Sequence, residues 1–522
     1  MEEKNILIDG KNLTTTHIAK LVYDLETKIE LPEHIFTNSQ KTHTFLLEQI
    51  EKKLIYGINT GFGPMASYVI STDQLENLQK NLILSHAVGM GQPIHANFVL
   101  ASMTVRLNTL CKGYSGVSPE LIERLKIFIN HKIIPIVPEH GAVGTSGDLV
   151  QLAHIALGII GEGEAIYQGQ KKTVKDILRH LNIPVHYKLK PKEGLALING
   201  TSAMTGVSAL VCHHAERIIS MAIACGAMSL ELVGGFSDSI SETLHNLRPH
   251  SGQTAIARNL RKILASSNMM TDRKNFQNKH LPNHEVRQIN HSVQEVYSFR
   301  CIAQILGPIL ETFQNTKKIV ETEMNSVTDN PIIDLEEQAF LHGGNFHGEY
   351  IASAIDQLKI SLVKLTMLSE RRTNFFFNHK KNAMFPPFLN LKTPGLDLAL
   401  QGLQFVATST TAHSQSLAFP HSIHSISTNL DNQDVVSMGC DAALFAAKVV
   451  ENAYIVLAIE VIALTQAVDF LGKNNNLSDY SKKLYMEIRK VFPKVEEDRN
   501  LTAQLDEVVK VLKKSDSINM NF

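Results

Sequence analysis

Five long apolar segments dominate the chain after residue 200, and they limit its fold more than any other feature. Each segment is apolar on at least one face, and few strand signals lie between them. Helices of this length bury their apolar faces by packing against one another. The sequence therefore predicts a mainly α fold, with a long central helical bundle and a smaller mixed N-terminal part. The predicted helices cover residues 201–235, 300–328, 346–376, 398–418 and 437–472.

Three domains are predicted along the chain. An N-terminal domain covers residues 1–200, the helical bundle covers 201–475 and a C-terminal helical tail covers 476–522. The apolar spacing within each domain predicts its smaller elements. These are a strand at 5–8, a helix beginning at 14–16, a polar connection to about residue 50, helices at 73–89, 98–110 and 119–130, a glycine turn with its helix at 141–162, a strand-and-turn segment at 161–188, a mobile loop at 265–292 and two tail helices joined at Pro493.

The charge balance and the cysteines narrow the class of function. The formal net charge is −1, whereas nucleic-acid and membrane-surface binding usually need a basic face. The five cysteines are scattered, which is typical of reduced thiols in a cytosolic protein. The start of the chain lacks the features of a signal peptide, and the apolar stretch 453–468 is interrupted by Glu460 and is too short to span a bilayer. The sequence predicts a cytoplasmic protein that acts on a small molecule.

The run GAVGTSGDL, at residues 141–149, carries three glycines and unusual chemistry. Ser146 has no histidine or lysine base nearby in the sequence, which an ordinary nucleophilic serine needs. Because glycine lacks a Cβ, the nitrogen of Gly147 can attack the carbonyl carbon of Thr145 in a tight bend. Loss of water from that ring, and then from Ser146, leaves an electrophilic methylidene carbon. The alternative is a glycine-rich turn in which Ser146 or Asp148 caps a helix.

This run resembles the cofactor-forming segment of the aromatic amino acid ammonia-lyases, which cyclise Ala-Ser-Gly into methylidene-imidazolone (MIO). The resemblance covers about residues 50–475 and includes at least five motifs in the family's order. It implies an MIO group formed autocatalytically from Thr145, Ser146 and Gly147. Thr145 departs from the usual alanine, but its side chain lies outside the ring, so the chemistry is expected to survive.

A second glycine-rich run, YGINTGFG at residues 56–63, matches the family motif that carries the catalytic tyrosine. The resemblance implies that Tyr56 is the general base that removes the β-proton of the substrate. Gly63 falls on the glycine that lines the substrate. By its composition alone, the run is a poor helix and is typical of a lid-like loop.

Carboxylate binding is assigned to Arg300, in the run YSFRC at residues 297–301. Its guanidinium has the donors for a bidentate contact, and the family uses this arginine for the substrate carboxylate. The resemblance also implies that Tyr297 is positioned near the MIO group and that Asn199 contacts the substrate and helps to polarise the ring. The alternatives are an arginine in a surface ion pair and an asparagine in a turn.

Two polar strips resemble further parts of the family's pocket. Asn429, Asn432 and Gln433 lie in STNLDNQD, and Phe346 in GGNFHG matches an aromatic residue near the ring. The alternative for both strips is a polar loop.

Two pairs of histidines raise the question of a metal. They are His342 with His347, and His421 with His424. Neither pair has the helical spacing of a zinc site, and no cysteine or glutamate completes a set. No metal is predicted.

The sequence gives conflicting signals about the substrate. Ser85 and His86 align with the pair that faces the substrate's ring, and Ser-His is usual in histidine ammonia-lyases. Gln433 stands where those enzymes generally carry a glutamate, and a neutral amide cannot supply that charge to an imidazole. Residues 200–206 and 421–438 resemble bacterial tyrosine ammonia-lyases. The sequence therefore predicts L-tyrosine as the substrate, with His86 bonded to the phenol hydroxyl; L-histidine is the alternative and L-phenylalanine follows.

The resemblance also implies the assembly and the reaction. Members are homotetramers whose active sites are shared between subunits. Tyr56 would remove the β-proton, ammonia would leave to give a trans α,β-unsaturated acid, here p-coumarate, and Arg300 would hold the carboxylate. The alternatives are a 2,3-aminomutase that returns ammonia to the β-carbon, and an inactive helical scaffold that has lost MIO through Thr145.

Overall fold

The computed structural model describes residues 5–279, 293–514 and 520 of the chain. Its internal contacts divide the chain into two compact units. This division differs from the predicted boundaries at residues 200 and 475, because long helices run from one unit into the other; the three folding domains remain a prediction. Unit 1 contains Met1–His213, Asn315–Gln357 and Pro420–Ala447, and unit 2 contains His214–Gln314, Leu358–Phe419 and Lys448–Phe522.

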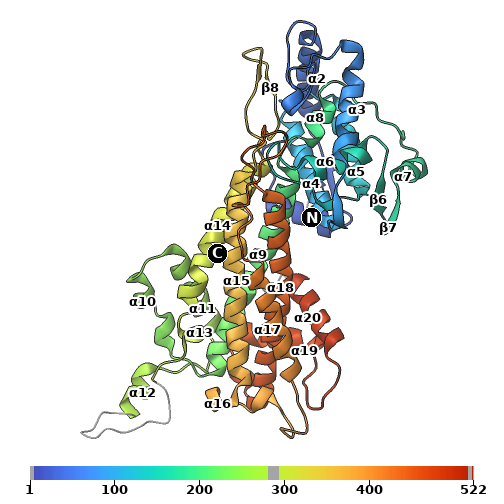
Figure 1. The fold of residues 1–522 in the computed structure, drawn as a ribbon. Coiled ribbons are helices and arrows are strands. Elements are labelled where there is room, and N and C mark those ends of the chain that lie inside the picture. The colour runs from blue at the N-terminus through green and yellow to red at the C-terminus, as the bar shows by residue number, and fades with distance from the viewer. Residues whose placement is uncertain (1–4, 280–292, 515–519, 521–522) are drawn as a thin grey trace. The chain divides into compact units, whose positions relative to one another are not determined.

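Long helices confirm the mainly α fold (Figure 1). Each of the five predicted apolar segments forms one long helix, and the observed ends lie within four residues of the predicted ones. The apolar residues of these helices make up much of the buried core, as their length and amphipathic spacing require. The five are α9 (Ser202–Leu232), α14 (Ile302–Met324), α15 (Glu349–Phe377), α17 (Gln401–Ser416) and α18 (Gly439–Leu471).

Helix α18 extends well beyond the apolar stretch 453–468 that was predicted to be too short to span a bilayer. The whole helix is long and apolar enough to cross a membrane, so that prediction about length is wrong. However, 78% of its most apolar window is buried inside the protein. Glu460 in this helix is fully buried and pairs with Arg372, with Nε 2.5 Å from Oε1. These features are those of a core helix, which passes the same test of length and composition.

Unit 1 combines short helices with four small sheets. Helix α2 (Glu33–Gln49) occupies the segment predicted to be a polar connection; its sequence is polar, and it buries only one narrow side, which includes Ile35 and Leu46. The N-terminal strand and the helix capped by Thr14 are as predicted. Further helices of this unit are α1 (Thr15–Tyr23), α4 (Ala96–Cys111), α5 (Pro119–Asn130) and α7 (Val174–His180). The strands pair as β1 (Asn5–Leu7) with β2 (Lys28–Glu30), and β3 (Met90–Pro93) with β5 (Pro138–His140). The other two sheets are β4 (Ile134–Pro135) with β6 (Glu164–Tyr167) and β7 (Gln170–Thr173), and β8 (Ile332–Asp334) with β9 (Ala339–Leu341).

Three helices of unit 1 pack against one another and carry predicted motifs at their ends: α3 (Leu75–His86), α6 (Leu149–Ile159) and α8 (Glu193–Ile198) (Figure 1). Helix α3 ends at the selector pair, α6 begins directly after the glycine turn, and α8 ends next to Asn199. All six residues of α8 are buried. The packing of these helices therefore fixes where three of the motifs lie.

Unit 2 holds the remaining helices. The two tail helices are confirmed on either side of Pro493. The predicted loop at 265–292 contains a short helix in its described part, and residues 280–292 lie outside the described residues. The helices are α10 (Glu242–Asn246), α11 (Ser251–Leu264), α12 (Arg273–Lys279), α13 (Tyr297–Arg300), α16 (His379–Asn382), α19 (Asp479–Val491) and α20 (Thr502–Lys514).

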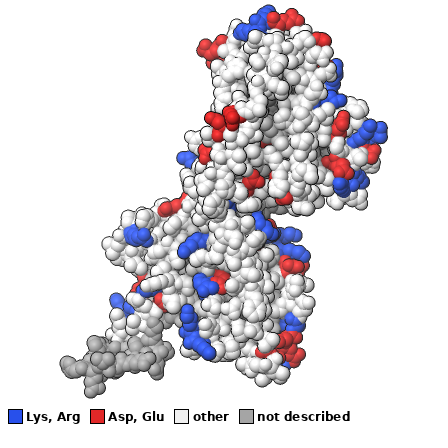
Figure 2. All heavy atoms as spheres, in the orientation of Figure 1, with Lys and Arg blue, Asp and Glu red and all other residues white. Residues whose placement is uncertain are grey.

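Charged side chains of both signs are interspersed on the face drawn in Figure 2. Among the described residues on that face, no broad area carries one sign alone. This agrees with the near-zero net charge and with a small-molecule ligand.

Candidate active site

The glycine run forms a strained turn between β5 and α6. Gly144, Ser146 and Gly147 have positive φ angles of 78°, 65° and 74°. The backbone nitrogen of Gly144 donates to the carbonyl of Gly147 at 3.1 Å. A positive φ is uncommon for serine, so the surrounding structure holds Ser146 in a conformation that it would not adopt on its own. A strained bend is what the predicted cyclisation requires.

Gly147 is pressed against Gly200. Asp148 N donates to the carbonyl of Gly200 at 2.9 Å, and Gly200 N donates to the carbonyl of Ser146 at 3.1 Å. A Cβ at position 147 would lie 1.8 Å from the Gly200 oxygen, so only glycine fits there. This pairing also places Asn199, one residue before Gly200, beside the turn.

The two backbone groups that would join in the ring are free to react. Within the described residues, neither the N–H of Gly147 nor the carbonyl of Thr145 makes a hydrogen bond, although the groups around them are paired. The Thr145 hydroxyl donates to the carbonyl of Val435 at 2.7 Å, so this side chain has its partner outside the turn. The residues present therefore fit an MIO group made from Thr145, Ser146 and Gly147.

Asp148 is a functional candidate that the sequence analysis considered only as a helix cap. Its side chain does not cap α6. Its Oδ2 accepts from Met204 N at 2.7 Å, and its fully buried Oδ1 has no partner among the described residues. Burial raises the pKa of Asp148 to about 7, against the lowering effect of backbone bonds from Met204 and Ala203. Asp148 can therefore donate or accept a proton next to the turn at neutral pH. In the sequence, the only indication of such a role is an acidic residue directly after Ser-Gly.

The hydroxyl of Tyr56 closes the loop that carries it. Gly63 N donates to Tyr56 Oη at 2.9 Å, and Gly57 N donates to Thr60 Oγ1 at 3.0 Å. Gly57 and Gly63 have positive φ angles of 67° and 51°, which glycine adopts without strain. The half-buried tyrosine is thus held on an ordered loop.

A second loop joins this tyrosine to the glycine turn. A Cβ at Gly63 would lie 2.6 Å from Asn429 Nδ2, so the two residues are in contact. Thr428 and Gln433 exchange two backbone hydrogen bonds of 3.1 and 3.3 Å, which close the loop between them. Gln433, only 5% exposed, donates from Nε2 to Ser146 Oγ at 3.1 Å. The structure therefore brings the predicted base, three predicted pocket residues and the predicted cofactor serine into one connected site.

Two other predicted pocket residues lie nearby. Asn432 is exposed, and its backbone nitrogen donates to the carbonyl of Asn429 at 3.1 Å. Phe346 is half-buried and lies two residues before Gly348, whose N donates to the carbonyl of Gly144 at 3.0 Å. Their contacts with a substrate remain predictions.

The selector pair lies at the end of α3. His86 Nδ1 is 2.9 Å from the carbonyl of Leu82, and Ser85 Oγ donates to the same carbonyl at 3.1 Å. Because a carbonyl only accepts, Nδ1 carries the proton in the neutral ring and Nε2 is left as an acceptor. The hydroxyl of a phenol and the N–H of an imidazole can both donate to Nε2.

Asn199 caps the end of α8, and its side-chain amide is hydrogen-bonded to residues 329 and 330. Its Nδ2 donates to Asp329 Oδ1 and to the carbonyl of Asn330, both at 3.3 Å. Asp329 in turn pairs with the buried Lys192. Asp329 and Lys192 were not predicted from the sequence, because they are 137 residues apart and carry no motif of their own.

Tyr297 and Arg300 belong to α13 in unit 2, and their places in the active site remain predictions. The Arg300 guanidinium lies over the Tyr297 ring at 4.7 Å and donates to Gln294 Oε1 at 2.6 Å. Its buried Nε has no partner among the described residues. Donor capacity for a carboxylate is therefore present.

The histidines of the two pairs contact other protein groups. His421 and His424 pack edge to face at 5.1 Å, and His347 Nε2 is 3.3 Å from the carbonyl of Val435. In the described part of the chain, no cluster of three His, Cys, Asp or Glu side chains could hold a metal.

Comparison with known proteins gives one family. The family model described as aromatic amino acid lyase matches residues 13–490. The histidine ammonia-lyase of Geobacillus thermodenitrificans is 38% identical over 507 residues, covering 96% of each chain, and that of Bacillus subtilis is 37% identical, covering 98% of this chain and 97% of the relative.

Solved structures of the same family have the same fold as this chain. The tyrosine aminomutase of Streptomyces globisporus superposes with a TM-score of 0.93 at 33% identity, covering 98% of this chain and 97% of that one. The histidine ammonia-lyase of Trypanosoma cruzi gives a TM-score of 0.87 at 32% identity, covering 98% and 93%. Full-length matches of sequence and fold, together with the connected site, show that the chain belongs to the aromatic amino acid lyase family and is a carbon-nitrogen lyase.

Proposed function

We propose that the chain is an MIO-dependent histidine ammonia-lyase that converts L-histidine into urocanate and ammonia. The observation that carries the proposal is the set of relatives named histidine ammonia-lyase, which are 36–38% identical over nearly the whole chain. Ser85 and His86 support it, because His86 presents an acceptor that an imidazole N–H can use. These relatives favour the alternative of the sequence analysis over L-tyrosine.

The MIO group, when formed, supplies an electrophilic carbon that makes the amino group of the substrate a better leaving group. Thr145, Ser146 and Gly147 would form it, and Gln433 lies against the serine oxygen. The phenol oxygen of Tyr56, held by Gly63 N–H, is the group assigned to remove the β-proton.

The remaining pocket roles follow the family's motifs. The guanidinium of Arg300 is assigned to the substrate carboxylate, beside Tyr297. Asn199 is assigned to the substrate next to the turn, and Phe346, Asn429 and Asn432 are assigned to the pocket wall.

L-Tyrosine is the second candidate, because Gln433 favours it. A buried neutral amide beside Ser146 offers no charge to an imidazolium ring. A phenol needs no such charge, and its hydroxyl suits the free Nε2 of His86.

Assembly into a homotetramer with shared active sites is part of the proposal. Apolar side chains are exposed on α17 and after it: Phe405, Val406, Ile423, Ile426 and Leu430. Subunit contacts would remove such surface from water. The five cysteines form no disulfide within the described residues, which suits a reducing cytoplasm.

Ultraviolet spectroscopy of the purified protein with L-histidine, L-tyrosine or L-phenylalanine tests the proposal, because each unsaturated acid absorbs distinctly. We expect urocanate from L-histidine, and no product from Ser146→Ala. Coumarate instead would establish the second candidate. A β-amino acid, found by chromatography, would identify an aminomutase, which the likeness to tyrosine aminomutase makes worth testing. A Ser146 peptide of unmodified mass would indicate an inactive scaffold.

A further inference from the structure

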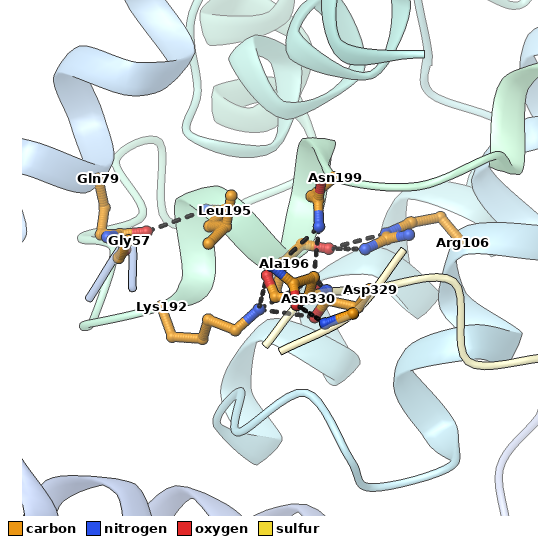
Figure 3. A network of polar contacts seen from close by, with 10 residues as sticks. Gly57, Gln79, Arg106, Lys192, Leu195, Ala196, Asn199, Asp329 and Asn330 are labelled. Carbon is orange, nitrogen blue, oxygen red and sulfur yellow. Dashed lines mark hydrogen bonds and ion pairs between the residues drawn. The ribbon is translucent and has the colours of Figure 1, made fainter. Parts of the chain in front are cut away.

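A fully buried ion pair lies beneath Asn199. Lys192 and Asp329 both have 0% side-chain exposure, and Lys192 Nζ lies 2.9 Å from each carboxylate oxygen of Asp329. Lys192 also donates to the carbonyl of Asn330 at 3.2 Å. Figure 3 shows these contacts converging below Asn199. A buried ion pair often stabilises a protein no more than apolar residues of the same volume do. Its position next to Asn199 therefore points to a role other than stability.

The pair fixes the orientation of the Asn199 amide. The Nδ2 of Asn199 faces Asp329 Oδ1 and the Asn330 carbonyl, each 3.3 Å away. The carbonyl of Asn330 can only accept, and so can Asp329 while it is ionised, so the NH₂ group must point toward them. The carbonyl oxygen of Asn199 then points away from Asp329 (Figure 3). It accepts no hydrogen bond within the described residues and is not fully buried.

The ion pair limits what Asp329 can offer to Asn199. Burial lowers the pKa of Lys192, and the adjacent Asp329 opposes that effect. Lys192 Nζ lies 2.9 Å from both carboxylate oxygens of Asp329, and a carboxylate in an ion pair only accepts hydrogen bonds. The pair thus excludes the flipped amide, in which the oxygen of Asn199 would face an acceptor.

Two further side chains hold the backbone that carries Asn199. Gln79 accepts from Leu195 N at 2.9 Å and donates to the carbonyl of Gly57 at 3.1 Å. Arg106 Nε donates to the carbonyl of Ala196 at 2.7 Å. Gln79 and Arg106 therefore bond helix α8 from two sides, and Gln79 also ties it to the Tyr56 loop (Figure 3).

We propose that Lys192 and Asp329 are positioning residues that make Asn199 present its carbonyl oxygen to the α-ammonium group of the substrate. The inference rests on the proposed function. An amide oxygen cannot bind a carboxylate, but it suits the three donors of an ammonium. Asn199 precedes Gly200, which pairs with Ser146, so this acceptor lies beside the segment with which the amino group reacts.

Calorimetric binding to proteins that carry Ser146→Ala tests the inference without turnover. The probes are L-histidine with urocanate and L-tyrosine with p-coumarate, since each acid lacks the ammonium. Asp329→Asn offers Asn199 both a donor and an acceptor and removes the charge that holds Lys192. We expect the dissociation constant of the bound amino acid to rise about tenfold, the loss of one hydrogen bond to a charged group, while that of its acid changes less than about twofold.

Glu460→Gln is the matched control, because it breaks the Arg372–Glu460 pair, whose side chains are equally buried. It is expected to lower thermal stability as Asp329→Asn does, but to leave both dissociation constants unchanged. If Asp329→Asn does not fold, Asn199→Ala is measured instead and should show the same selective loss.

Equal weakening of amino acid and acid, or no weakening of either, would overturn the inference and leave the proposed function standing. A selective loss in Glu460→Gln would overturn it too. Failure of all four probes to bind the Ser146→Ala protein, together with no product from the wild type, would overturn the proposed function and the inference with it.

Discussion

The side-chain amide of Gln433 donates to the hydroxyl of Ser146 across 3.1 Å. These residues are 287 positions apart in the sequence. The contact places the residue that gives the conflicting substrate signal directly against the serine of the predicted cofactor. If Gln433 selects the substrate as proposed, substrate choice and cofactor formation meet at this contact.

Gln433→Glu is expected to shift the preference toward L-histidine. A carboxylate at this buried position would pair with an imidazolium ring and would be of no use to a phenol. The ratio of kcat/KM for L-histidine to that for L-tyrosine should rise about tenfold, equivalent to about 1.4 kcal/mol. Steady-state absorbance assays measure it. Gln40→Glu, the same change on the exposed side of α2, should leave the ratio unaltered; an unaltered ratio in Gln433→Glu would remove Gln433 from substrate selection.

Gly147→Ala is expected to abolish cofactor formation. The added methyl group would lie 1.8 Å from the Gly200 oxygen, at a position whose φ of 74° also strains alanine. Mass spectrometry of the peptide containing Ser146 should then lack the deficit of two waters expected in the wild type, and activity should be lost. Gly402→Ala, on α17 with nothing within 4 Å of the new Cβ, should keep both. A normal mass deficit in Gly147→Ala would contradict the ring closure derived from the turn.

Tyr56→Phe is expected to reduce kcat by about 10²- to 10⁴-fold with a small change in KM, because it removes a general base and leaves the ring in place. Tyr68→Phe serves as the control, since Tyr68 is 67% exposed on the same stretch of chain. Stopped-assay rates with the preferred amino acid measure the effect. A kcat within about twofold of the wild type would assign the base to another residue.

Asp148 is expected to make stability depend on pH. Its pKa in the folded protein, about 7, lies above the ordinary value of 3.8, so the folded protein holds this proton more tightly than the unfolded chain does. The stability of the wild type relative to Asp148→Asn should therefore fall as the pH rises from about 4 to about 7, and then level off. Thermal melts across this range measure the difference. A flat difference for Asp148→Asn would mean that the pKa of Asp148 is not raised in the folded protein.

The sequence by itself determined the long helices and predicted the chemistry of the turn. The long apolar segments form α9, α14, α15, α17 and α18 because a helix is fixed by local spacing. The capability of residues 145–147 is also local, since glycine and serine stand next to each other. Helix α2 was missed, because its polar sequence buries few apolar residues and its helix depends on packing.

Only the tertiary structure decided how the motifs meet. The contacts of Ser146 with Gln433, Gly63 with Asn429, and Lys192 with Asp329 join residues from distant parts of the chain. Each depends on packing between elements, which no periodicity or spacing along the chain records. The positive φ of Ser146 and the raised pKa of Asp148 likewise arise from their surroundings, because strain and burial are properties of the folded protein and not of a sequence motif.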